Sequence, residues 1–123
     1  MYGQPLLNVQ QGERMYKWFI IRPHWGRQAD YELRIITKEK TDGVLELVAY
    51  NFLIVNGRRI KRDINRAPNV LKEELDTVIH NILTGLEVRP EEMETVDLSS
   101  FQTVDEQIAY LKERDRVETH YVA

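Results

Sequence analysis

The fold is decided by residues 31–62, which read YELRIITKEKTDGVLELVAYNFLIVNGRRIKR. Apolar and polar residues alternate from residue 31 to residue 38, a pattern that predicts a β-strand with one buried face. The pairs Asp42-Gly43 and Asn56-Gly57 are typical of two-residue hairpin turns, because both residues of each pair tolerate positive φ. We therefore predict three consecutive antiparallel strands. The third should end near residue 62 and lie at an edge of the sheet, where its charge discourages further pairing.

The first of these turns also predicts a register. A two-residue turn pairs Leu33 with Phe52 and Ile35 with Tyr50, so that these apolar residues share one face of the sheet. The opposite face is then both basic and partly apolar. Its predicted members are Arg34, Lys38, Arg58 and Arg62, beside Ile36, Leu53, Val55 and Ile60.

The flanking segments complete the prediction of secondary structure. Apolar residues occupy both alternating faces of residues 15–22, which favours a central strand covered on both sides. From Pro68 to Gly85 the apolar period changes to three or four residues, which predicts an amphipathic helix. Residues 87–100 are an acidic connection. A second helix is expected to start at Thr103, which forms a capping box with Glu106.

This order of elements predicts an α+β fold. The predicted fold is a four-stranded antiparallel meander followed by two helices that pack on one face of the sheet. Weak alternation in residues 117–122 leaves a fifth strand open. We expect residues 1–13 to be a flexible N-terminal arm and residues 14–123 to form a single α+β domain.

Charge is distributed unevenly along the chain. Residues 1–66 hold 12 basic and 7 acidic side chains, a net charge of +5, and residues 67–123 hold 5 and 13, a net charge of −8. Such asymmetry indicates either a polyanionic partner or two oppositely charged surfaces that meet. Because the whole chain carries a net charge of −3, any surface that binds a polyanion has to be local.

Composition excludes several classes of site. The chain has no cysteine, which rules out disulfides, thiolate metal sites and a cysteine nucleophile, and which favours a cytoplasmic location. No apolar stretch is long enough to span a bilayer, and we expect no membrane partner. The three histidines, His24, His80 and His120, are too scattered for metal-ligand spacing. We predict no metal and no cofactor, and nothing in the sequence supports an enzyme, although a site assembled from distant residues stays open.

Two basic segments are candidates for binding. Residues 58–62 are the densest, and their guanidinium groups suit the phosphate oxygens of a polyanion. The other is the loop His24–Arg27, in which a tryptophan stands among basic residues. The candidate binding residues are Arg22, Trp25, Arg27, Arg34, Arg58 and Arg62. The alternative role of residues 58–62 is an edge strand kept soluble by its charge.

These observations lead to two hypotheses for the function. The first is a small non-enzymatic binding or regulatory module that acts through protein–protein contacts, either by self-association as a homo-oligomer or by docking on a larger protein. The alternative is binding of a nucleic acid or nucleotide through the basic sheet face and the His24–Arg27 loop. Binding to nucleic acid should weaken steeply with salt, because phosphate contacts release counterions.

Overall fold

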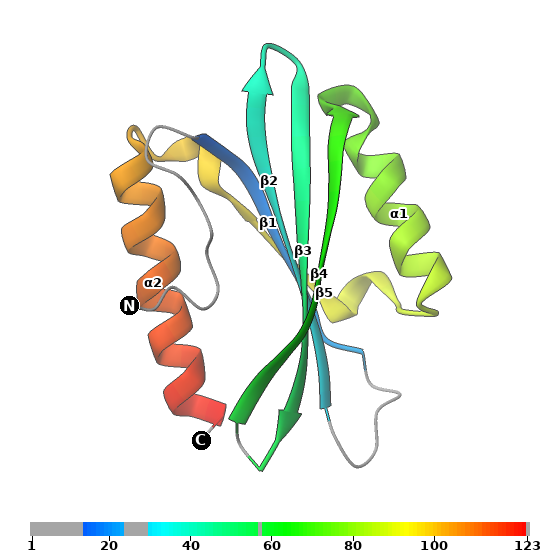
Figure 1. Ribbon diagram of the computed structural model, residues 1–123, viewed down its shortest axis with the longest axis vertical. Helices are drawn as coiled ribbons and strands as arrows, with labels where there is room; N and C mark the ends of the chain where they lie inside the picture. The colour runs from blue at the N-terminus through cyan, green and yellow to red at the C-terminus, as the bar shows by residue number, and fades with distance from the viewer. Residues whose placement is uncertain (1–13, 24–29, 57, 123) are drawn as a thin grey trace.

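The computed structural model of the protein describes residues 14–23, 30–56 and 58–122, so the predicted arm at residues 1–13 lies outside the described residues (Figure 1). The strands are β1 (Arg14–Ile21), β2 (Asp30–Thr41), β3 (Val44–Val55), β4 (Arg58–Leu71) and β5 (Met93–Asp97). The helices are α1 (Leu75–Gly85) and α2 (Val104–Val122), with 3₁₀ turns at Lys72–Glu74, Pro90–Glu92 and Leu98–Ser100.

The five strands form one antiparallel sheet in the order β4-β3-β2-β1-β5. This confirms the α+β class, the meander and the position of β4 at an edge. The fifth strand is not the tail, because α2 continues through Val122. It is β5, which lies inside the segment that we expected to be an acidic connection and which pairs with β1 from Met93↔Ile21 to Asp97↔Lys17.

A β-bulge at Lys40 overturns the predicted register between β2 and β3. The turn itself forms as expected, since Thr41 pairs with Val44 and Gly43 has φ of 78°. The next pair is Glu39↔Leu45, so Lys40 is an extra residue on β2. This slip places Leu33 opposite Asn51 instead of Phe52. Because side chains alternate along a strand, a slip of one residue moves the even-numbered aromatic residues of β3 to the other face.

The sheet therefore has two apolar faces, and the two helices cover opposite sides of it (Figure 1). Leu75, Ile79 and Leu83 of α1 pack on a core that includes Phe19, Ile35 and Leu47. Ile108 and Leu111 of α2 pack on the core that contains Trp18, Tyr50 and Phe52. The prediction that both helices share one face is wrong. Each apolar face needs its own cover, and one helix is available for each.

Strand β4 is more than twice as long as predicted. We expected it to end near Arg62 and a helix to begin at Pro68, but β4 continues to Leu71 and α1 begins at Leu75. Pro68 is tolerated because an edge strand does not need every backbone N–H for pairing. The predicted end of the first helix at Gly85 is confirmed, and so is the pairing of Leu53 with Ile60 across the second hairpin.

The capping box at the start of α2 is confirmed. The Glu106 backbone N–H donates to Thr103 Oγ1 at 3.1 Å, and the Thr103 N–H donates to Glu106 Oε1 at 3.1 Å. We expect Thr103→Ala to lower the free energy of unfolding by about 1 kcal/mol, because one helix N–H loses its acceptor. Urea denaturation measures this change. Thr77→Ala, at an exposed position of α1, is the matched control, and equal effects of the two substitutions would contradict a capping role.

Candidate functional site

The structure does not gather the six predicted binding residues on one surface. Trp25 and Arg27 lie outside the described residues. Arg34 points to the α2 side of the sheet and is buried, whereas Arg58 pairs with Val55, whose side chain lies on the α1 side. Arg62 occupies a bulge of β4 and is exposed. The single basic face predicted from the sequence therefore does not form, because the bulge at Lys40 separates its members.

Arg22 and Arg34 instead surround a buried carboxylate that sequence reasoning missed. Glu32 of β2 has no exposed surface, and its Oε2 accepts a hydrogen bond from Arg22 Nε at 2.7 Å. Its Oε1 accepts from Arg34 Nε at 3.0 Å and from Arg59 Nε at 2.9 Å. We call these four residues the Glu32 cluster. It joins β2, β4 and the residue that follows β1, because its members come from those three segments.

The charges in the Glu32 cluster are strongly coupled. Burial by itself raises the pKa of Glu32, but the adjacent guanidinium groups of Arg34, Arg59 and Arg22 outweigh it and hold the pKa below its ordinary value. Aromatic rings line the same region, since the Arg34 guanidinium lies 5.2 Å from the Trp18 ring centroid. Arg34 is 2% exposed and Arg59 is 7% exposed. The buried members of the cluster hold strands together, and Arg22, which is 45% exposed, is the member that a partner could reach.

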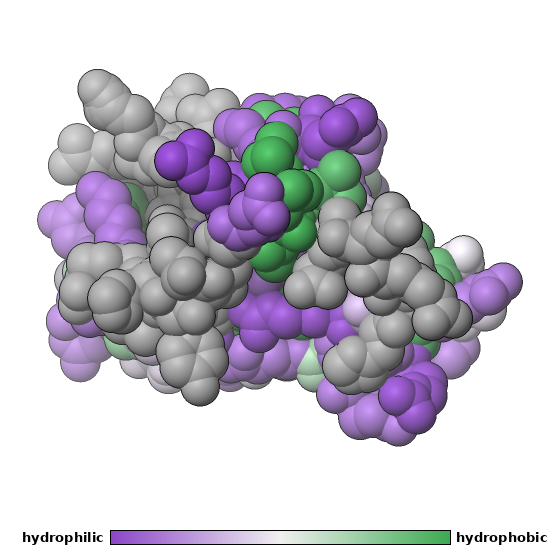
Figure 2. All heavy atoms as spheres, turned by 90° about the horizontal axis from the view of Figure 1, so that it is seen from below, coloured by the Kyte–Doolittle hydropathy of each residue, from purple (hydrophilic) through white to green (hydrophobic). Residues whose placement is uncertain are grey.

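The exposed large apolar residues lie on β4 and are divided between its two faces, since Ile60 pairs with Leu53 on the α1 side and Ile64 pairs with Tyr50 on the α2 side. Ile60, Ile64 and Leu71 are 45%, 41% and 42% exposed, and they are the exposed large hydrophobic residues of the described part of the chain. Exposed basic residues stand among them: Arg58, Lys61, Arg62 and Arg66. Figure 2 looks at the end of the molecule that carries the β3–β4 turn and shows apolar atoms at the surface between hydrophilic ones. The strand predicted from the sequence ends near Arg62 and therefore omits residues 63–71 of β4.

A groove of about 340 Å³ lies between α1 and the sheet. Its apolar lining includes Leu33, Ile35 and Ala49, and its polar lining is Tyr31 and the side chains of three asparagines, Asn51, Asn65 and Asn81. The Tyr31 hydroxyl donates to Asn51 Oδ1. Burial, and then the negative charge of Asp63, raise the pKa of Tyr31. No charged residue lines the groove, so an occupant would be neutral where it enters.

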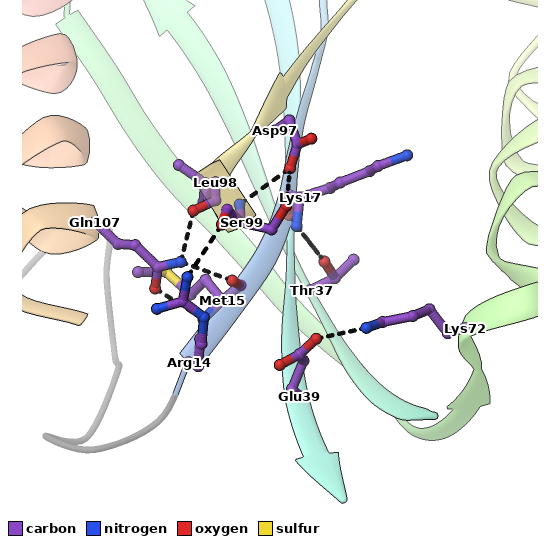
Figure 3. A network of polar contacts seen from close by, with 10 residues as sticks. All are labelled: Arg14, Met15, Lys17, Thr37, Glu39, Lys72, Asp97, Leu98, Ser99 and Gln107. Atoms are coloured by element: carbon purple, nitrogen blue, oxygen red, sulfur yellow. Dashed lines mark hydrogen bonds and ion pairs between the residues drawn. The ribbon is translucent and has the colours of Figure 1, made fainter. Parts of the chain in front are cut away.

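Two further polar features connect secondary-structure elements: the Lys72–Glu39 ion pair beside a second pocket, and the hydrogen bonds of Gln107 (Figure 3). The pocket, of about 310 Å³, lies beside the β2–β3 turn. Lys72 Nζ donates to Glu39 Oε2 across it at 2.6 Å, and this hydrogen bond raises the pKa of Lys72. The buried side chain of Gln107 bonds to the backbone of Met15 and Leu98.

The described residues hold no cluster of three potential metal ligands. Of the histidines, His80 is exposed on α1, and the side chains of His24 and His120 lie outside the described part. Asp97 accepts hydrogen bonds from the backbone and the hydroxyl of Ser99, which lower its pKa. That pair closes a 3₁₀ turn after β5, so it has a local structural role. Among the described helices, none is long and apolar enough to cross a membrane.

Comparison of the chain with models of protein families, with curated proteins and with solved structures finds no match. The proposals that follow therefore depend on the geometry and charge of the chain's own residues.

Proposed function

We propose that the protein is a non-enzymatic binding module that acts through protein–protein contacts and docks through β4. The observation that supports this proposal is the concentration of the exposed large apolar residues on one edge strand. Single exposed hydrophobic residues are normal on a protein surface. Three of them lie on one edge strand with arginines between them, and the buried centre of an interface is apolar and enriched in arginine.

The charge of β4 favours docking on another protein over two-fold self-association. The strand carries five basic residues and one acidic residue, a net charge of +4. Antiparallel pairing of β4 with a second β4 would bring like charges together, and its bulges and Pro68 would interrupt the ladder. A partner that presents acidic and apolar residues avoids the repulsion between like charges.

Selection from an unbiased peptide library tests this proposal. Selected peptides should lose at least tenfold in affinity for the double variant Ile60→Ser/Ile64→Ser, because each exposed isoleucine buries apolar surface in the complex. Thr77→Ser/Thr84→Ser is the control, since it makes the same number of substitutions at exposed positions of α1, outside β4. Peptides whose affinity is unchanged by the double variant would refute docking through β4.

Nucleic-acid binding is the second candidate, and the four exposed basic residues of β4 favour it. It predicts that Arg58→Glu with Arg62→Glu abolishes binding of a labelled oligonucleotide while the fold is unchanged. It also predicts a steep loss of affinity as salt rises, because phosphate contacts release counterions. Absence of binding at low salt would refute it and leave the protein partner.

A further inference from the structure

The two bulges of β4 leave one regular stretch in the middle of the strand. Asp63 pairs with Asn51 just after the bulge at Arg62, and Ala67 pairs with Leu47 just before the second irregularity. Residues 63–67 therefore pair with β3 without interruption. They lie at the edge of the sheet, where about half of the backbone N–H and C=O groups point away from the neighbouring strand. Among the described elements, β4 packs mainly on β3 and makes a smaller contact with α2.

Side chains along this stretch alternate between the two faces. Ile64 and Arg66 pair with Tyr50 and Val48, whose side chains belong to the core beneath α2. Asn65 pairs with Ala49, whose side chain packs with the core beneath α1. An added strand would therefore meet Ile64 and Arg66 on one face, and Asp63, Asn65 and Ala67 on the other.

The charged residues of β4 indicate which residues a partner strand would carry. Residues 63–67 hold one acidic residue, Asp63, and one basic residue, Arg66, and they follow the exposed basic residues Arg58, Lys61 and Arg62 of the same strand. Arg66 is half-exposed, and its guanidinium lies 3.7 Å from a carboxylate oxygen of Glu46. At that distance and exposure the ion pair is weak, so Arg66 can also bind a partner's carboxylate. A basic segment would be repelled by the same strand, because like charges directly opposite one another are destabilising.

We propose that residues 63–67 bind an extended acidic–apolar segment of a partner protein as a sixth, antiparallel strand. This inference rests on the proposed function and adds the partner's chemistry. Backbone hydrogen bonds supply affinity, as in other cases of strand addition, and alternate side chains supply specificity. A carboxylate of the partner lies beside Arg66, and an apolar side chain lies beside Ile64.

The groove beside α1 restricts which partner side chain can lie opposite Asn65. Asn65 lines both this groove and the α1 face of residues 63–67. A partner side chain opposite Asn65 therefore lies at the margin of a groove that has apolar walls, asparagine amides and no charged lining residue. We expect the partner to place its acidic residues on the α2 face and a neutral residue on the α1 face.

N-methylated peptides test the backbone part of the proposal. The probe is a synthetic extended peptide that carries one acidic and one apolar residue at the positions facing the α2 side and neutral residues at the positions between them, and its affinity for the full chain is measured by fluorescence anisotropy. Two versions carry N-methyl groups at odd or at even positions. One version should lose at least tenfold in affinity and the other should bind as the parent does, since alternate amides of a strand point to opposite sides. Equal effects of the two versions would overturn strand addition.

Charge reversal at Arg66 tests the proposal that the partner segment is acidic. Arg66→Glu should weaken the acidic peptide at least tenfold and should allow a basic analogue of the same pattern to bind. Arg89→Glu is the matched control, because Arg89 is an exposed arginine outside β4. A basic analogue that binds the unmodified protein as tightly as the acidic peptide would overturn the choice of an acidic partner.

The outcomes separate this inference from the proposed function. If library peptides require Ile60 and Ile64 but designed acidic strands do not bind, docking through β4 stands and strand addition fails. If the affinity of neither the library peptides nor the designed peptides depends on β4 residues, both docking through β4 and strand addition fail. Sedimentation velocity across a concentration series tests a second copy as the occupant, and self-association that Ile64→Ser abolishes would overturn the inference of a foreign partner.

Discussion

Glu32→Gln is expected to lower the free energy of unfolding by about 3–5 kcal/mol, the range observed when one partner of a buried ion pair is removed. The substitution takes away the negative charge and leaves the buried guanidinium groups of Arg34 and Arg59 uncompensated. Chemical denaturation monitored by tryptophan fluorescence measures the change, because Trp18 lies beside Arg34.

The lowered pKa of Glu32 predicts that the free energy of unfolding depends on pH. The pKa of Glu32 is lower in the folded protein than in the unfolded chain, so the folded state favours the charged form. The stabilisation is complete above the unfolded pKa, near 4.5, and is lost as the pH falls through the folded pKa. The difference in unfolding free energy between the native protein and Glu32→Gln should therefore shrink on acidification below about pH 5.

Glu91→Gln provides the control for Glu32. It makes the same chemical change at an exposed carboxylate 4.0 Å from Arg89, where an ion pair contributes about 0–1 kcal/mol. A Glu32→Gln protein that is as stable as the Glu91→Gln protein at neutral pH would contradict the structural role of the Glu32 cluster.

Gln107→Leu is expected to lower the free energy of unfolding by about 3 kcal/mol, because it leaves buried backbone groups without partners. Gln107 is completely buried, and its Oε1 accepts from the Met15 N–H at 3.0 Å. Its Nε2 donates to the carbonyl oxygens of Met15 at 2.8 Å and Leu98 at 2.7 Å (Figure 3). This one side chain ties α2 to β1 and to the turn after β5.

Gln102→Leu is the control for Gln107, since Gln102 is exposed just before α2. Urea denaturation of the two variants side by side isolates the effect of the buried amide. A loss below about 1 kcal/mol for Gln107→Leu would show that the freed backbone groups find other partners, and would contradict the anchoring role.

The turns could be predicted from the sequence, but the bulges could not. Asp42-Gly43 and Asn56-Gly57 have residues that tolerate positive φ, and Gly43 and Asn56 adopt it. Lys40 carries no comparable mark, and its one-residue insertion decides which side chains share a face. Strand β5 was missed because only Met93 and Val96 of its five residues are apolar, and because an edge strand needs little burial to pair.

The candidate site could be predicted only in part. Alternation places Glu32 and Arg34 on a polar face, and a buried ion cluster has the same pattern as a solvated face. The difference arises from Arg22, which follows β1, and from Arg59 of β4, which meet Glu32 only in the fold. The basic start of β4 was visible in the sequence. Its apolar continuation was hidden, because the spacing of Val70 and Leu71 also fits the helix that follows.

Hydrogen exchange of the β4 amides tests the central claim most directly. The measurement compares the unmodified protein with and without a saturating library-selected peptide. Addition of the peptide to β4 as a strand predicts that exchange of alternate amides within residues 63–67 slows at least tenfold on binding, because those that point outward gain hydrogen-bond acceptors. Protection confined to α1, α2 or β5, with the exchange of residues 63–67 unchanged, would contradict β4 as the docking strand.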